Sequence, residues 1–138
     1  MRSRLLNRRI GFSVLVAGLL LFPARAAPAH VFLERSEPRV GSEVPGLPAT
    51  VKLWFDGRLE PLFSTVKVID AVTGKEVSLP PVNVGDQELG WMEIQVAPLP
   101  PGAYEVAWEA MARDGHLTRG KFRFTVKEPA ADRKKGDH

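Results

Sequence analysis

Two of the three histidines in this 138-residue chain lie beside other groups that can bind a metal ion. His30 follows the segment Ala27-Pro28-Ala29, whose small residues in an A-x-A pattern are typical of a signal-peptidase site. Cleavage after that segment would give His30 a free amine beside its imidazole, so one residue could chelate an ion through two nitrogens. His116 follows Asp114 by two residues. In an extended backbone their side chains would share one side, about 7 Å apart at Cα.

The first 29 residues favour this cleavage because they have the regions of a signal peptide. A start with four arginines and no acidic residue leads into a mostly apolar run from Ile10 to Phe22. That run suits a signal peptide and is shorter than the roughly 20 residues that span a bilayer as a helix. The pair Arg8-Arg9 leaves export by the general secretion or the twin-arginine route open. We therefore predict a periplasmic protein whose signal peptide, residues 1–29, is removed after Ala29.

Removal of the signal peptide changes the charge of the protein. It takes five basic residues and no acidic one from a formal net charge of +3, which leaves −2. Acidic and basic residues are well mixed in residues 30–138, so we expect no nucleic-acid binding. The chain has no cysteine, which excludes disulfides and thiolate ligands. The remaining length suits one domain.

The pattern of residues 30–127 predicts an all-β fold. Short segments in which apolar and polar residues alternate are separated by proline and glycine, and none has apolar residues at helical spacing over three turns. We expect an immunoglobulin-like Greek-key β-sandwich of about seven strands, followed by a disordered tail at 128–138. The expected strands are Val31–Glu34, Thr50–Asp56, Ser64–Ala71, Glu76–Leu79 (ending before Pro80-Pro81), Trp91–Val96, Ala103–Met111 and Gly120–Val126.

The alternation also predicts which side chains form the core. In three strands one face is apolar and should point inward, whereas Trp54 should be exposed or in a second layer. The inward residues are Val51, Leu53 and Phe55 in the first of these strands, Tyr104, Val106 and Trp108 in the second, and Phe122, Phe124 and Val126 in the third.

The segment Arg113-Asp114-Gly115-His116 has a second interpretation. Asp-Gly is a common signal for a tight hairpin turn, here between the strands that end at Met111 and begin at Gly120. His116 would then be a solvated turn residue. An N-terminal histidine alone is likewise often accidental, and His138 lies in the polar tail.

The combination of these features resembles the CopC family of exported copper-binding proteins. The resemblance covers nearly all of the mature chain and rests on an N-terminal histidine followed by S-x-P, an L-x-F strand, a proline-glycine-tyrosine segment and a D-x-H motif. These motifs are His30 with Ser36-Glu37-Pro38, Leu53 to Phe55, Phe63-Ser64, Pro98 to Trp108, and Asp114-Gly115-His116 with Gly120 and Phe124-Thr125-Val126.

The resemblance implies a function and a ligand set. It implies a periplasmic copper carrier or sequestering protein, not an enzyme, that binds one Cu(II) per chain through the amine and ring of His30, through Asp114 and through His116. The nitrogen and oxygen donors themselves suit Cu(II), whereas Cu(I) prefers sulfur. The implied partner is a CopD-like inner-membrane copper transport protein, and we expect a monomer.

The chain departs from the family pattern at two places. Some relatives have F-S-E where this chain has Phe55-Asp56-Gly57, so a glutamate near the site is missing, and either Asp56 or Glu60 could replace it. Relatives that also hold Cu(I) have a methionine-rich stretch. Here Met92 and Met111 fall in expected strands, and we predict that they serve packing.

Two other classes of function fit part of the sequence pattern. A terminal histidine on a β-sandwich also fits a copper polysaccharide monooxygenase, but the short chain leaves no room for long loops and its one tyrosine, Tyr104, is expected in the core. A metal-free interaction module could use Trp54 or Trp91 as a binding surface. Neither class accounts for His30 together with the Asp114-x-His116 motif.

Overall fold

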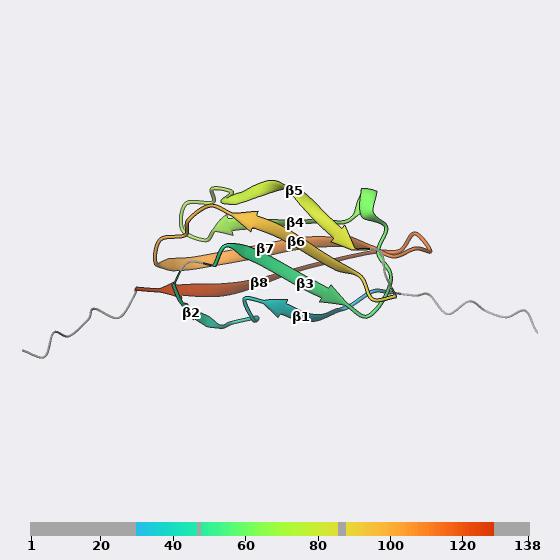
Figure 1. Ribbon diagram of the computed structural model, residues 1–138, viewed down its shortest axis with the longest axis horizontal. Coiled ribbons are helices and arrows are strands. Elements are labelled where there is room, and N and C mark those ends of the chain that lie inside the picture. The colour runs from blue at the N-terminus through green and yellow to red at the C-terminus, as the bar shows by residue number, and fades with distance from the viewer. Residues whose placement is uncertain (1–29, 47, 86–87, 129–138) are drawn as a thin grey trace, which may run out of the picture.

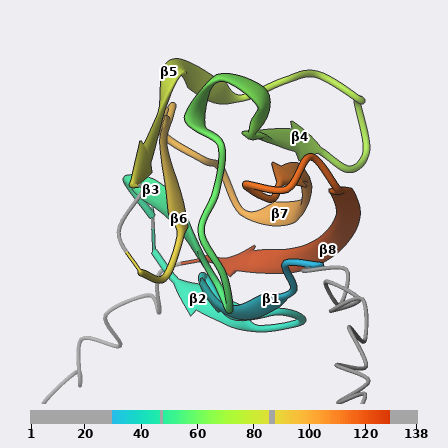
Figure 2. The same cartoon turned by 90° about the vertical axis from the view of Figure 1, so that its right-hand side faces the viewer.

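The computed structural model describes residues 30–46, 48–85 and 88–128. Within these residues eight strands form two four-stranded sheets that pack face to face (Figures 1 and 2). This arrangement confirms the predicted all-β, immunoglobulin-like sandwich. The predicted signal peptide and, apart from Glu128, the predicted tail lie outside the described residues. No helix in the described ranges is long and apolar enough to cross a membrane.

Each sheet is formed by strands that are mostly not neighbours in sequence. The first sheet has the order β1-β3-β6-β5 and consists of β1 (Leu33–Glu37), β3 (Thr50–Phe55), β6 (Trp91–Val96) and β5 (Ser78–Gly85). The second has the order β2-β8-β7-β4 and consists of β2 (Glu43–Pro45), β8 (Leu117–Lys127), β7 (Gly102–Met111) and β4 (Thr65–Asp70). A short 3-10 helix, η1 (Pro61–Phe63), precedes β4.

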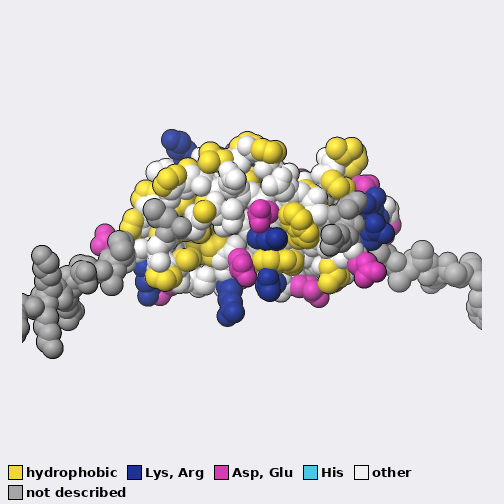
Figure 3. Space-filling view, in the orientation of Figure 1, with side chains coloured by type: hydrophobic (Ala, Val, Ile, Leu, Met, Phe, Trp, Pro, Cys, Tyr) yellow, Lys and Arg dark blue, Asp and Glu magenta, His cyan; other side chains and the backbone are white. Residues whose placement is uncertain are grey.

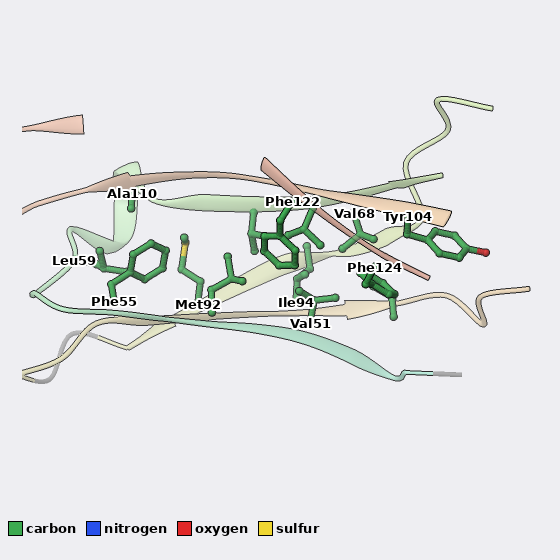
Figure 4. Close-up of a cluster of buried hydrophobic side chains, with 14 of the residues drawn as sticks. Val51, Phe55, Leu59, Val68, Met92, Ile94, Tyr104, Ala110, Phe122 and Phe124 are labelled. Carbon is green, nitrogen blue, oxygen red and sulfur yellow. The ribbon is translucent and has the colours of Figure 1, made fainter. Parts of the chain in front are cut away.

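The core lies between the two sheets and is formed by the predicted inward faces (Figure 4). Eight of the nine residues predicted to point inward are buried, and the ninth, Trp108, is half-buried and packs against the core with its ring 5.2 Å from that of Phe55. Met92 is fully buried among them, as predicted for a packing residue. Trp54 is half-buried, and the guanidinium of Arg35 lies 3.8 Å from its ring centre.

Two strands differ from the prediction in number or extent. β2 was not predicted, because three residues are too few to show alternation; it pairs in parallel with β8. The prediction that a strand ends before Pro80-Pro81 was wrong, since β5 runs through both prolines to Gly85. β5 is an edge strand with a register irregularity between Leu79 and Asn83, and such a position tolerates residues that lack an N–H donor.

The other boundaries shift by a few residues. β1 begins and ends later than predicted, and β8 begins three residues earlier, at Leu117. Its longer first part continues the β7 pairing up to the pair Met111 and Leu117. The turn that carries the predicted Asp114 and His116 is therefore the tip of the longest hairpin among the described strands.

Candidate metal centre

The turn between β7 and β8 is a tight, hydrogen-bonded loop over residues 112–116. The Ala112 N–H donates to the His116 carbonyl (2.9 Å), and the Gly115 N–H donates to the Ala112 carbonyl (2.9 Å). Gly115 has φ of +89°, a backbone conformation that glycine adopts without steric cost. The interpretation of Asp-Gly as a hairpin turn is therefore correct.

Asp114 and His116 meet inside this turn. Nδ1 of His116 lies 2.9 Å from Oδ2 of Asp114, and the His116 backbone N–H donates to Oδ1 (3.1 Å). The two side chains converge because the chain turns at Gly115, so the extended backbone assumed from the sequence spacing was wrong. The carboxylate accepts the proton of Nδ1, and this contact does not involve Nε2, the other ring nitrogen.

The first described residue lies against the same turn. The ring centres of His30 and His116 are 5.2 Å apart at an interplanar angle of 61°, and the Phe32 ring lies 6.2 Å from that of His30. His30, Asp114 and His116 are all exposed to solvent. The fold thus brings together the histidine at the proposed N-terminus and the D-x-H motif, which are far apart in sequence.

Three residues, Gly57, Thr118 and Asp56, contact the segment that follows His30. Val31 is buried, with its side chain over Gly57, where an added Cβ would lie 2.8 Å from Cγ1 of Val31. The Thr118 hydroxyl donates to the Val31 carbonyl (2.8 Å). The Phe32 N–H donates to Oδ1 of Asp56 (2.7 Å), and the Asp56 N–H donates back to the Phe32 carbonyl (3.1 Å).

Asp56 and Glu60, the two candidates for the missing glutamate, have different positions. Asp56 contacts the backbone of the N-terminal segment, as described above. Glu60 pairs with Arg113, the residue before Asp114, at 3.1 Å, and its N–H donates to the Met111 carbonyl (2.8 Å). Asp56 therefore steadies the His30 side of the site, and Glu60 steadies the turn.

The side chains are near one another but do not yet form a coordination sphere. In the described ranges, no three His, Asp or Glu side chains are arranged so that they could hold a metal ion. Both carboxylate oxygens of Asp114 face N–H groups of His116. Each oxygen keeps a lone pair, so these contacts do not exclude binding to a metal.

The sequence does not indicate the contacts that Val31, Gly57 and Thr118 make in this region. Their contacts join segments that are distant in sequence, such as Val31 and Thr118, which are 87 positions apart. One local signal was present for Thr118: it lies two residues after His116, so in a strand the two side chains share a face.

Comparisons with known proteins agree on one family. The model of the CopC domain matches residues 33–127. The chain is 32% identical to copper resistance protein C of Escherichia coli over 121 residues, which cover 83% of this chain and 95% of that protein.

Solved structures give the same result. CopC from Methylosinus trichosporium OB3b has a TM-score of 0.65 at 31% identity, covering 72% of this chain and 95% of that one. PcoC, described as a methionine-rich copper resistance protein from Escherichia coli, has a TM-score of 0.60 at 31% identity, covering 72% of this chain and all of PcoC.

Proposed function

This chain belongs to the CopC family, and on that premise we propose that it binds copper as a carrier or sequestering protein in copper homeostasis and resistance. We propose that it holds one Cu(II) ion through the amine and ring of His30, through Asp114 and through His116. The observation that supports this ligand set is the 5.2 Å approach of the two imidazoles beside the Asp114 carboxylate. Two imidazoles, an amine and a carboxylate suit the tetragonal coordination of Cu(II).

Several properties of the protein follow from this proposal. The amine of His30 becomes a ligand only if the chain is exported and cut after Ala29, so the site requires removal of residues 1–29. The A-x-A pattern and the signal-like regions support periplasmic export. The proposed carrier is a single domain, residues 30–127, acts as a monomer and has no catalytic role of its own.

The surroundings of the site support contact with a protein that gives or receives copper. Four apolar side chains at this end of the sandwich are more than a third exposed: Phe32 (58%), Leu62 (91%), Phe63 (62%) and Leu117 (37%). η1, the β7–β8 turn and the start of β1 lie at the same end (Figure 1). Exposed apolar side chains beside a binding site are a common feature of interaction surfaces. We propose a CopD-like inner-membrane copper transport protein as the partner.

The first prediction concerns the amine of His30. A protein that begins at His30 should bind one Cu(II), whereas the same protein with one alanine added before His30 should bind much more weakly, because the chelate ring is lost. We expect a loss larger than the roughly 10–100-fold that removal of an outer-shell partner costs. Competition titration and intact mass with and without Cu(II) measure affinity and stoichiometry.

A matched control carries the added alanine after His138 and should bind as the unextended protein does. Equal affinity of the two N-terminal forms would exclude His30 as a chelating ligand. An exported protein whose mass includes residues 1–29 would exclude cleavage.

A further inference from the structure

The segment from His30 to Phe32 is anchored on both sides before any metal is bound. On one side the Thr118 hydroxyl donates to the carbonyl of Val31 (2.8 Å). On the other side, Oδ1 of Asp56 accepts the Phe32 N–H (2.7 Å), and the backbone N–H of Asp56 donates to the Phe32 carbonyl (3.1 Å). Hydrogen bonds therefore join the residues directly after the proposed N-terminus to the rest of the domain.

This anchoring is unusual for a chain terminus. The first residues of a domain are ordinarily poorly ordered unless something ties them down, and a ligand on a mobile end loses conformational entropy when the metal binds. Val31 is 2% exposed and carries the anchored carbonyl, one residue after His30. The amine and ring of His30 are therefore one residue away from Val31, whose position is fixed by burial and by the hydrogen bond to its carbonyl.

Thr118 also links the two halves of the site. It lies on β8 two residues after His116, in the half-buried row next to the turn. Its hydroxyl is also 3.3 Å from the Ala110 carbonyl, but a hydroxyl has one proton, and the Val31 carbonyl is the nearer acceptor. The start of β8 thus follows His116 directly and fixes the position of the segment that carries His30.

We propose that Thr118 and Asp56 are positioning residues of the copper site, which hold residues 30–32 so that the donors of His30 face His116. This inference rests on the proposed function. In this role neither residue binds copper. The two together reduce the motion that copper binding must otherwise arrest, so they raise affinity through preorganisation rather than through bonds to the metal.

The test compares substitutions that remove each contact with substitutions that keep it. Thr118→Val removes the hydroxyl and keeps a β-branched side chain suited to a strand, whereas Thr118→Ser keeps the hydroxyl. Asp56→Ala removes the acceptor, whereas Asp56→Asn keeps an oxygen for the Phe32 N–H and removes the charge. Thr125→Val is the matched control, since Thr125 is also a half-buried threonine of β8, near its other end.

Two quantities are measured on proteins that begin at His30. The first is hydrogen exchange of the Phe32 amide in the copper-free protein, which reports the anchoring itself. The second is Cu(II) affinity by competition. Thr118→Val and Asp56→Ala should speed exchange and lower affinity roughly 3- to 10-fold, the range that corresponds to one hydrogen bond of ordinary net strength. Thr118→Ser, Asp56→Asn and Thr125→Val should match the wild type in both quantities.

The possible results separate this inference from the proposed function. If the wild type has no Cu(II) site that depends on His116, the proposed ligand set is wrong. The positioning role is then wrong as well, whatever the exchange rates of the Phe32 amide are. If the site exists but Thr118→Val and Asp56→Ala bind copper like the wild type, the positioning role is wrong. It is also wrong if affinity falls while Phe32 exchange stays unchanged, or if Asp56→Asn loses as much affinity as Asp56→Ala, which would indicate that Asp56 acts through its charge.

Discussion

His116 combines the two interpretations that its sequence motif allowed. It is a turn residue, because its carbonyl accepts the Ala112 N–H, and it is half-exposed (49%). It is also placed for ligation, because Asp114 holds Nδ1 and the ring lies 5.2 Å from that of His30. A tight turn is therefore compatible with a metal site, and it supplies the orientation that a flexible loop would lack.

At the residue scale we predict that His116→Ala changes the kind of copper site and leaves the fold intact. Without the second imidazole, Cu(II) should remain only on the N-terminal amine and ring of His30, more weakly bound and with an altered electron paramagnetic resonance spectrum. His138→Ala serves as the control and should leave the spectrum unchanged. A spectrum that is the same for His116→Ala and wild type would mean that His116 is a solvated turn residue alone.

The individual residues show what a sequence can and cannot predict. His30, Asp114 and His116 can be proposed as ligands from the sequence because their chemistry and the family motifs are local in it. The bond from Thr118 to Val31 was not found, because it exists only once β8 lies beside the N-terminal segment. Contacts between a hydroxyl and a backbone carbonyl have no compositional signature, so they follow from the fold and not from the motif.

At the scale of elements, Tyr104 ties the start of β7 to the turn before it. Its ring is buried and stacks on Phe124, and its hydroxyl donates to the Pro100 carbonyl (2.5 Å). This is the arrangement known as a tyrosine corner. Burial, together with the negative charge of Asp70, raises the pKa of the Tyr104 hydroxyl above 10.0. The sole tyrosine is therefore a structural residue, as its place in the sequence predicted.

We predict that Tyr104→Phe lowers the free energy of unfolding by about 1 kcal/mol at neutral pH, the usual net value of one hydrogen bond. Because the folded-state pKa is raised, the contribution of the neutral tyrosine is complete below pH 10.0 and is lost as pH rises through the folded-state pKa. Urea unfolding at pH 7 and above pH 10 measures both values. A substitution without effect at pH 7 would show that the hydroxyl contributes nothing to stability.

The strands were predictable to the extent that their alternation is strict. β6 has the predicted bounds, Trp91–Val96, and apolar and polar residues alternate in it from Met92 to Val96. Pro80-Pro81 predicts a strand end inside β5, because the sequence does not reveal that this strand lies at an edge, where prolines are tolerated. β2 depends on its pairing with β8, which its own three residues cannot indicate.

At the scale of the whole molecule, the two methionines of the described strands lie in different sheets. Met92 is fully buried in the core, on β6 of the first sheet (Figure 4), and Met111 is half-buried at the end of β7 in the second. Basic and acidic side chains are interspersed on the face seen in Figure 3, so that face has no large patch of one sign. The proposed copper site therefore depends on nitrogen and oxygen donors at one end of the sandwich.

Because the proposed ligands include no sulfur, we predict that reduction releases the metal. Ascorbate with a Cu(I) chelator should remove copper from the protein, because imidazole, amine and carboxylate bind Cu(I) poorly. Replacing Met92 and Met111 by leucine keeps the apolar volume and should leave the release rate unchanged at a small cost in stability. Optical titration of the Cu(I)-chelator complex measures the release. Slower release from the wild type than from the double variant would reveal a sulfur site.

The prolines of β5 affect how copies of the protein behave when they meet. An edge strand with a free row of backbone donors can serve as a template onto which another chain adds, and this is a common start of aggregation. Pro80 and Pro81 lack N–H groups, and because successive N–H groups of a strand point to opposite edges, one of the two leaves a gap in the outward row, which the irregular register beside them interrupts further. A chain without disulfides, exported as we propose, thus carries within one strand its own protection against edge-to-edge association.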